Sequence, residues 1–594
     1  MNDDNRSGKL SRRGFLSFLG GTAATLAASG LLGRFFGNNA LAKESGISGK
    51  SEGIKVAVKD NGRRILLKNG FIADGTGSPG FKGDLMINGD TIEEIAPGGI
   101  EFTGETMDCE GLVVAPGFID MHSHMDWVLP AEGHDELKTP FTAQGVTTFV
   151  AGNCGFGVAA YMKNSPHREL IEKRIMDRIF SVEWDTYGQF FDRVKRRSHT
   201  HNMAVLAGSG TTRMSMRGMK SDPFSPDEMK LYRGLLEEAL DQGARGVSYG
   251  LQYEPDIFTT MDELKEIARL VKSRDAVITV HMKAYSALSP SYPVRPFGRA
   301  HNLLAIDDML SVAKETGVKM QLSHLIFVGE KSWKTCSEAL ELVDGARKSG
   351  LDVQFDTYAY HCGVSVINVF LPQWFLARLP ENYESGSARR KLRMEMYIVR
   401  KLLGFGYRDI QVTNAIDPEL VQYNGMFVDE IAKARRMDEL DCLLDISKRT
   451  KGAARVLNHR YSKLENVHDM IRHPAALFMT DAWVTPAGVQ NPGAFGNFPL
   501  LLQYARDHKL VPMEDAVRKM TGASADRFRL EKRGYLKKDF AADITIFNWN
   551  TIKDNTTRER SDAPPTGIEG VFVNGKRVLT NGRVDASVKA GVVI

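Results

Sequence analysis

The middle of the chain repeats one pattern, in which a short apolar segment precedes a stretch with the spacing of an amphipathic helix. Two of the helical stretches open with capping boxes, at residues 225–228 and 260–263. Strands that alternate with helices form a parallel sheet, and many such units favour a (β/α)8 barrel. We therefore predict an α/β fold with a barrel over about 112–535 and strands near 113–120, 146–151, 203–208, 246–248, 277–280, 319–322, 352–356 and 476–479.

The two flanks of this region have the texture of antiparallel sheet. Asn-Gly pairs follow short alternating runs at Asn69-Gly70, Asn88-Gly89 and Asn574-Gly575, and such pairs are a strong hairpin signal. We predict that 61–111 and 536–594 together build one small composite β-sandwich. The interval of about 120 residues between the last two predicted strands is too long for an ordinary connection. It contains a charged helical stretch at 388–402, so we expect an inserted segment at about 364–470.

Charge and cysteine usage exclude two classes of protein. The 594 residues carry a formal net charge of +4, of which the first 42 contribute +3, and no long Lys/Arg run remains after them. A nucleic-acid partner is therefore not expected. The five cysteines are scattered without C-x-x-C pairs, which does not fit a disulfide framework in a chain of this length.

The N-terminus resembles a twin-arginine export signal. Arg12-Arg13 precede a Gly/Ala-rich apolar stretch that ends near Leu32, and Ala40-Leu41-Ala42 provides a cleavage site of the A-x-A type. The alternative is an uncleaved membrane anchor, although the stretch is short and glycine-rich for a span of about 20 residues. We expect the twin-arginine export machinery to bind residues 1–42 and to deliver a folded periplasmic or secreted protein. Residues 43–60 would be a linker, and no stable membrane span would remain after cleavage.

Residues that can bind a metal follow five of the predicted strands. In an α/β barrel the carboxyl ends of the strands meet on one face, which holds the active site. Imidazole, thiolate and carboxylate groups are suitable zinc ligands. Each residue alone has a plainer interpretation, since a histidine or aspartate often ends a strand without binding anything and a cysteine is often a small core residue. Their common position favours a zinc site built from His122, His124, Cys154, His281, His324 and Asp481.

Several sequence motifs resemble one enzyme family. His122-Ser123-His124, directly after a Pro-Gly-Phe-Ile-Asp run, is similar to the signature of the amidohydrolase superfamily. The run 145–155, which contains Cys154, resembles the narrower family of N-acyl-D-amino-acid deacylases, or D-aminoacylases. Further similar stretches lie at 246–255, 281–283, 355–360 and 516–522. The resemblance covers about 60–594 and implies the same (β/α)8 barrel with a composite β-sandwich.

The resemblance also implies roles for individual residues. Cys154, His281 and His324 would hold a tight Zn²⁺ ion, and His122, His124 and Asp481 would line a second, weaker position. Asp481 would be the general base that takes a proton from the attacking water and passes it to the leaving amine of a small-molecule amide. Tyr253 would donate a hydrogen bond to the oxyanion. The remaining predicted substrate contacts are Lys283, Tyr253, Tyr358 and Ile326.

Departures from the family pattern affect the substrate rather than the metal. Ile326 stands where relatives carry a lysine, and Asn491-Pro492-Gly493 stands where many have His-Pro-Arg. Both lost cations would bind a substrate carboxylate. The last predicted strand also ends in Thr-Asp-Ala where Ser-Asp-Gly is usual. N-acyl-D-amino acid hydrolysis is the primary hypothesis. A less acidic amide, a carbamate or a lactone is the alternative, and a non-catalytic metal-binding protein, which would be expected to have lost a ligand, is a remote third.

Overall fold

The computed structural model describes residues 56–59, 61–175, 179–196, 199–293 and 298–594. The predicted signal, 1–42, lies outside the described residues, as does all of the predicted linker except 56–59. The described residues belong to one compact unit, Gly53–Ile594. Within these ranges no helix is long and apolar enough to cross a membrane.

Parallel strands form the centre of the structure. One sheet contains β8 (Phe118–Asp120), β9 (Val146–Ala151) and β10 (Asn202–Val205). A second sheet follows in the order β11 (Ala207–Gly208), β12 (Gly246–Gly250), β13 (Val277–His281), β14 (Lys319–Leu322), β15 (Val353–Thr357) and β19 (Ala476–Phe478). Leu206 alone separates β10 from β11. Strands therefore lie at all eight predicted positions, although 113–120 and 203–208 each contain two of them.

The strands at the two ends of this series are linked at their carboxyl ends. The Asp481 amide donates to the His122 carbonyl at 2.9 Å, and the His124 amide donates to the Ala482 carbonyl at 3.2 Å. Among the described residues β19 and β8 do not pair as a continuous ladder. The α/β class and the strand order of the prediction are thus confirmed, whereas a single closed eight-stranded sheet is not resolved.

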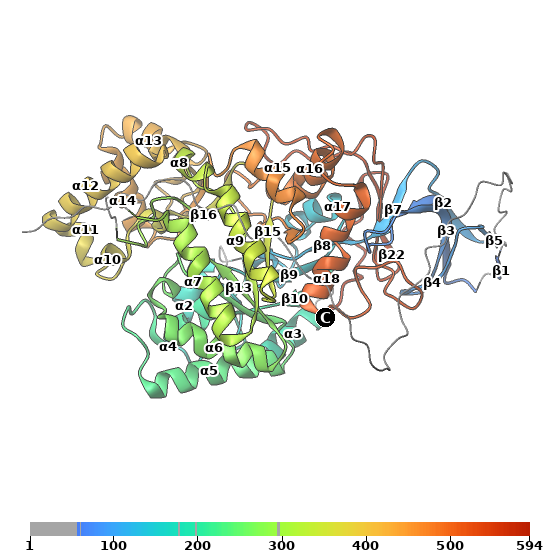
Figure 1. The fold of residues 1–594 in the computed structure, drawn as a ribbon, viewed down its shortest axis with the longest axis horizontal. Helices are drawn as coiled ribbons and strands as arrows, with labels where there is room; N and C mark the ends of the chain where they lie inside the picture. Colours follow the sequence, from blue (N-terminus) through green and yellow to red (C-terminus); the bar gives the residue numbers. More distant parts are fainter. Residues whose placement is uncertain (1–55, 60, 176–178, 197–198, 294–297) are drawn as a thin grey trace, which may run out of the picture. The chain divides into compact units, whose positions relative to one another are not determined.

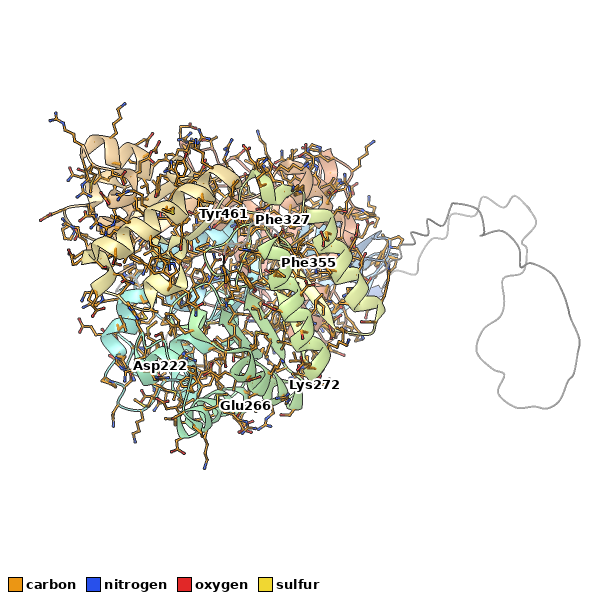
Figure 2. The ribbon with its side chains drawn as sticks, turned by 60° about the vertical axis from the view of Figure 1, so that its left-hand side comes forward. Asp222, Glu266, Lys272, Phe327, Phe355 and Tyr461 are labelled. Atoms are coloured by element: carbon orange, nitrogen blue, oxygen red, sulfur yellow. The ribbon has the colours of Figure 1, made fainter. Side chains whose placement is uncertain are left out.

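Helices cover the outside of the parallel strands (Figure 1). They include α4 (Ser209–Arg217), α5 (Pro226–Asp241), α6 (Met261–Ser273), α7 (His301–Thr316) and α9 (Cys336–Lys348), which contact the strands β11 to β15. Both predicted capping boxes are present, at the starts of α5 and α6. Helix α6 buries Leu264, Ile267, Ala268 and Val271 at helical spacing. Phe327 and Phe355, which are labelled in Figure 2, are fully buried.

Strands from both chain ends form a mixed nine-stranded sheet. Its N-terminal members are β2 (Arg64–Ile72), β3 (Phe81–Asn88), β4 (Thr91–Ala96), β6 (Glu105–Asp108) and β7 (Val113–Pro116). Its C-terminal members are β20 (Ile544–Phe547), β21 (Ile568–Val573), β22 (Lys576–Thr580) and β23 (Arg583–Val584). The two groups meet where β20 pairs antiparallel with β7. A separate parallel pair joins β1 (Val56–Val58) to β5 (Ile100–Phe102).

Two local predictions in this sheet were wrong. The predicted strand 113–120 is two strands, because β7 joins the nine-stranded sheet while β8 joins the parallel one. Gly117 lies between them, where an added Cβ would come within 2.3 Å of Thr147. Asn69-Gly70 is not a hairpin turn, because β2 continues through it with a register shift against β3. By contrast, Asn88-Gly89 and Asn574-Gly575 do separate paired strands.

A helical segment with its own small sheet lies between β15 and β19. The antiparallel strands β16 (Gly363–Val366), β18 (Arg455–Asn458) and β17 (Ile410–Asn414) pair in that order. The helices are α10 (Gln373–Leu376), α11 (Glu381–Glu384), α12 (Gly386–Leu403), α13 (Val428–Ala434) and α14 (Glu439–Arg449), followed by α15 (Leu464–Arg472). Their apolar side chains form a cluster distinct from the main core. Helix α12 contains the predicted charged helical stretch.

Candidate metal centre

The carboxyl ends of five parallel strands supply six side chains that converge. His122 and His124 follow β8, Cys154 follows β9, His281 ends β13, His324 follows β14 and Asp481 follows β19. All six are buried, and none is more than 8% exposed. Because parallel strands place their carboxyl ends on one face, residues more than 350 positions apart in the chain meet here.

Cys154 lies at the centre of this group. Its Sγ is 3.3 Å from His122 Nε2, 3.5 Å from His324 Nε2 and 3.8 Å from His281 Nδ1. His281 Nδ1 is 2.8 Å from His324 Nε2. The candidate ligand atoms of His122, Cys154, His324 and Asp481 all lie within 4.8 Å of one another.

Asp481 faces the two histidines of the His-x-His pair. Its Oδ1 is 3.3 Å from His122 Nε2 and 3.5 Å from His124 Nε2. Burial by itself raises the pKa of Asp481, but His324, His122 and His124 outweigh burial and hold that pKa below its usual range. The carboxylate is therefore ionised at neutral pH and can accept a proton or bind a cation.

The backbone is strained at three of the converging residues. Cys154, His324 and Asp481 have φ angles of 53°, 31° and 50°, in the left-handed region that residues other than glycine rarely adopt. Each such residue costs about 1–3 kcal/mol and persists only where its surroundings fix it. The strain coincides with the turns that point these three donor atoms toward one another.

A buried aspartate that the sequence analysis did not single out orients two of the histidines. Asp356, in β15, has Oδ1 3.1 Å from His122 Nδ1, and the same oxygen accepts the His324 amide at 2.6 Å. The side-chain amide nitrogen Nε2 of Gln321 donates to Asp356 Oδ2 at 2.9 Å. On the other side of the centre, the Gln252 Oε1 lies 3.2 Å from His281 Nε2. These contacts leave His122 Nε2 and His281 Nδ1 directed toward Cys154, as is usual for histidines that bind metal.

The donor set fits a Zn²⁺ ion. Burial lowers the pKa of His324 to about 4, and burial together with His324 lowers the pKa of His281 well below its usual value, so both imidazoles are neutral at pH 7 and keep a free lone pair. Burial raises the pKa of Cys154 to about 11, so this thiol would release its proton on binding an ion. Neutral imidazole, thiolate and carboxylate are the ligands that zinc sites use.

Comparisons with known proteins agree with this geometry. A model of the Amidohydrolase family matches residues 105–173 and 419–579. The D-aminoacylase of Alcaligenes xylosoxydans xylosoxydans is 28% identical over 515 residues, which span 86% of this chain and 94% of that protein. The N-acyl-D-glutamate deacylase of the same organism is 28% identical over 520 residues, 87% of this chain and 93% of that protein. A solved structure of a D-aminoacylase, an enzyme with a binuclear metal center, is similar to this one with a TM-score of 0.73 and 25% sequence identity. The similarity covers 89% of this chain and 99% of that one.

The chain is therefore similar to the amidohydrolases in part of its sequence and to the D-aminoacylases over most of its length. A further solved structure, the N-acyl-D-glutamate deacylase of Bordetella bronchiseptica with zinc and a phosphonate inhibitor, shares the fold at a TM-score of 0.72 and 24% identity, over 89% of this chain and 98% of that one.

Two of the predicted substrate contacts line a cavity at the candidate metal centre. The cavity has a volume of about 730 Å³, and its wall includes His281, Tyr253 and Ile326. The Tyr253 ring packs against the His281 imidazole, with centroids 4.2 Å apart, and its hydroxyl lies 3.3 Å from Ser365 Oγ. Burial raises the pKa of Tyr253 well above its usual value, so the hydroxyl remains a hydrogen-bond donor.

The other two predicted substrate contacts lie elsewhere. Tyr358 is buried but does not line the cavity; within the described part of the chain its hydroxyl has no hydrogen-bond partner. Lys283 lines a separate cavity of about 190 Å³, and its Nζ lies 5.2 Å over the Tyr292 ring. The prediction that Lys283 belongs to the substrate pocket is therefore not supported. The reason is that β13 ends at His281. Lys283 lies beyond the strand, so its side chain does not share a strand face with His281.

A buried arginine behind the centre was also missed. The Arg455 guanidinium lies 5.5 Å over the Trp127 ring and 5.4 Å over the Trp483 ring. Both tryptophans contact the His124 ring, at centroid distances of 4.4 and 5.4 Å. Arg455 belongs to β18 of the helical segment, more than 300 residues from His124, so no local pattern in the sequence could associate the two.

Asp356→Asn should weaken zinc binding by about 10–100-fold, because the residues that orient metal-bound histidines typically contribute that much. The substitution keeps the size of the side chain but removes the charge that faces His122 and the His324 amide. A competitive chelator titration measures the affinity, with the exposed Asp227→Asn as the control. Unaltered zinc affinity would show that Asp356 only fills space.

Proposed function

We propose that this protein uses zinc to cleave the amide bond of an N-acyl-D-amino acid, giving the D-amino acid and a carboxylate. The observation that carries the proposal is the convergence of Cys154, His281, His324 and Asp481 beside a buried cavity. The similarity to a D-aminoacylase and to N-acyl-D-glutamate and N-acyl-D-aspartate deacylases supports the substrate class.

In this proposal, Cys154, His281 and His324 hold the tight zinc ion, and His122, His124 and Asp481 line a second, weaker position. Bound zinc supplies Lewis acidity and lowers the pKa of water. Asp481 takes the proton of the attacking water, since its carboxylate is ionised and held in place by His122 and His124. It then returns that proton to the leaving nitrogen.

Tyr253 has the second chemical role in this proposal. Its protonated hydroxyl reaches the cavity wall beside His281, from where it donates a hydrogen bond to the oxygen that becomes negatively charged. The packing of its ring against His281 fixes the position of the hydroxyl, so that the donor is in place before the reaction begins.

A neutral amide is the second candidate substrate, and one observation favours it. Ile326, in place of the lysine expected from the family pattern, lies in the cavity wall and is only 6% exposed. An apolar side chain at that position cannot bind a substrate carboxylate, and a buried carboxylate without a partner is costly.

An activity screen with metal analysis tests the function. Zinc-loaded protein should hydrolyse N-acetyl-D-amino acids at least about 10-fold faster than their L-forms, a difference of about 1.4 kcal/mol in transition-state binding. Amine release is measured for D-forms, L-forms and neutral N-alkyl acetamides. Activity on the neutral amides alone would replace the first substrate class by the second, and no release from any N-acyl compound, whatever the length of its acyl chain, would refute both.

Export is a separate proposal, which rests on the twin arginine, the apolar stretch and the A-x-A site. A fusion of residues 1–42 to a reporter that folds in the cytoplasm should reach the periplasm, with a mature chain beginning near Lys43. Arg12→Lys together with Arg13→Lys should retain the reporter in the cytoplasm, whereas Lys9→Arg, which leaves the pair intact, should not. An uncleaved fusion in the membrane fraction would instead support an anchor.

A further inference from the structure

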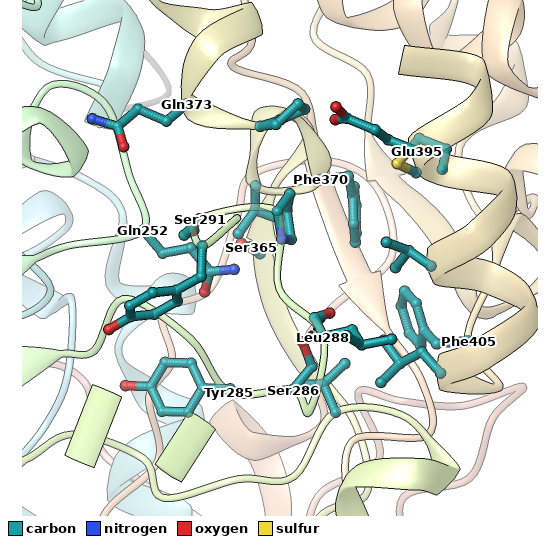
Figure 3. A pocket seen from close by; sticks show the side chains of 18 of the residues that line it. Gln252, Tyr285, Ser286, Leu288, Ser291, Ser365, Phe370, Gln373, Glu395 and Phe405 are labelled. Atoms are coloured by element: carbon teal, nitrogen blue, oxygen red, sulfur yellow. Dashed lines mark hydrogen bonds between the residues drawn. The ribbon is translucent and has the colours of Figure 1, made fainter. Parts of the chain in front are cut away.

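The cavity at the metal centre extends well beyond the reacting groups. It passes Ile326 and Val328 and reaches the helical segment, where α12 contributes Leu392, Met396 and Val399 to its wall. Figure 3 shows Tyr285 and Gln252 on one side of the space, Phe370 and Leu288 around it, and Phe405 and Glu395 on the side of α12. The strand-end loops and the helical segment therefore enclose one continuous space.

Charge is absent from the part of the cavity wall near the centre. Among the described residues that line it there, the polar ones, such as Gln252, Ser286 and Asn458, are neutral. The two Lys/Arg residues of the wall, Lys391 and Arg400, both belong to α12. Lys391 Nζ lies 3.9 Å from Glu395 Oε1, and Arg400 Nη1 lies 2.9 Å from Glu439 Oε2. Each cation therefore already has an acidic partner. The part of the cavity between His281 and α12 is therefore suited to an uncharged, apolar group.

The volume shows how large that group can be. A cavity of about 150 Å³ holds benzene, which corresponds to roughly 25 Å³ per heavy atom. The largest amino-acid side chain, that of tryptophan, has about ten heavy atoms and would fill roughly 250 Å³ on this scale. An acetyl group would fill still less. Neither the side chain of a D-amino acid nor a short acyl group accounts for a cavity of about 730 Å³.

We propose that the cavity holds the acyl chain of the substrate, an unbranched apolar chain of about 12–16 carbon atoms that fills roughly 300–400 Å³. This inference rests on the proposed amide hydrolysis and specifies its substrate class as N-(long-chain acyl) amines. In the reaction water adds its oxygen to the acyl carbon, the C–N bond breaks, and the amine leaves with a proton, so that a fatty acid is the second product. The carbonyl lies at the His281 and Tyr253 end, and the chain runs toward α12.

Chain-length dependence of hydrolysis is the first test. Each buried methylene is worth up to about fourfold in binding. The ratio of kcat/KM for N-octanoyl over N-acetyl forms of one D-amino acid should therefore exceed about 100, at concentrations below micelle formation. A ratio near one, with measurable N-acetyl hydrolysis, would overturn the acyl-chain inference and leave the proposed function standing.

Two methionines of α12 provide a matched pair of variants. Met396 lines the cavity, whereas Met394 on the same helix is 68% exposed. Met396→Glu should lower the octanoyl-to-acetyl ratio at least about 10-fold, because a charge then faces the chain. Met394→Glu should leave the ratio unchanged. Val399→Phe, which adds volume rather than charge, covers the case in which Met396→Glu does not fold. Equal ratios in the folded variants would contradict the inference.

Binding of the product acid tests the inference without relying on catalysis. Isothermal titration calorimetry of the zinc-loaded protein with dodecanoate and with acetate should show at least about 100-fold tighter binding of dodecanoate, and Met396→Glu should remove most of that difference. If no N-acyl amino acid is hydrolysed but dodecanoate binds in this way, the proposed function fails and the apolar site stands. Equal affinity for the two acids would refute the site itself.

Discussion

Asp481→Asn is expected to lower kcat/KM by about 10²–10⁴-fold on whichever amide the protein hydrolyses, because that is the usual contribution of a general acid–base group. Asparagine has nearly the same shape as aspartate but cannot take up a proton. The contacts of Asp481 with His122 Nε2 and His124 Nε2 place its carboxylate beside the centre, and these same contacts keep it ionised.

The measurement must separate a lost proton acceptor from a lost metal ion. Zinc content, thermal unfolding and kcat/KM are determined on the same preparation, since Cys154, His281 and His324 should retain the tight ion without Asp481. Asp222→Asn is the control, because that side chain is 80% exposed and lies on the surface (Figure 2). A folded, zinc-containing Asp481→Asn with near-wild-type turnover would refute the proposed role of Asp481.

The strands and the converging residues could be predicted from sequence because both follow from local patterns. Apolar runs mark the strands, capping boxes mark helices such as α5 and α6, and His281 and Asp481 stand directly at or just after strand ends. The rule that parallel strands meet at their carboxyl ends then brings those residues together without any knowledge of their distances.

The groups that orient the histidines could not be found in this way. Asp356 belongs to a sequence run that was noted only for its family resemblance, and its partner His122 lies 234 residues away. Its role depends on the register between strands, which no short motif encodes. Arg455 is a similar case, because its position behind His124 depends on how the helical segment packs.

Two local patterns that the structure does not follow can also be explained. Asn69-Gly70 carries a strong hairpin signal, yet β2 continues through it because β3, β6 and β7 all pair with that strand. Lys283 would share a face with His281 only if β13 continued, and the Met282 amide instead donates to the Tyr285 hydroxyl at 2.8 Å. At Asn69-Gly70, long-range strand pairing overrides a local turn preference, whereas after His281 a hydrogen bond within the following turn replaces the continuation of the strand.

Cys154→Ala is expected to remove most of the tightly bound zinc, which should fall from between one and two equivalents per chain to less than about half an equivalent, with activity falling in parallel. A catalytic zinc ion usually has three protein ligands, and this change leaves only His281 and His324 at the tight position. Sγ of Cys154 also lies within 3.8 Å of a nitrogen atom of each of three imidazoles, so alanine leaves these nitrogens facing one another without the thiolate.

The comparison that decides this prediction uses a second buried thiol. Cys109 is as buried as Cys154 but packs in the nine-stranded sheet, away from the converging histidines. Cys109→Ala therefore controls for lost packing alone. Zinc is counted by elemental analysis after dialysis against a weak chelator, and thermal unfolding is followed with and without added zinc. Only Cys154→Ala should lose both the metal and the stabilisation that zinc provides, since an ion that binds the folded state raises its stability. If Cys154→Ala instead keeps its zinc and its activity, the thiol is a packed core residue and the ligand set must be revised.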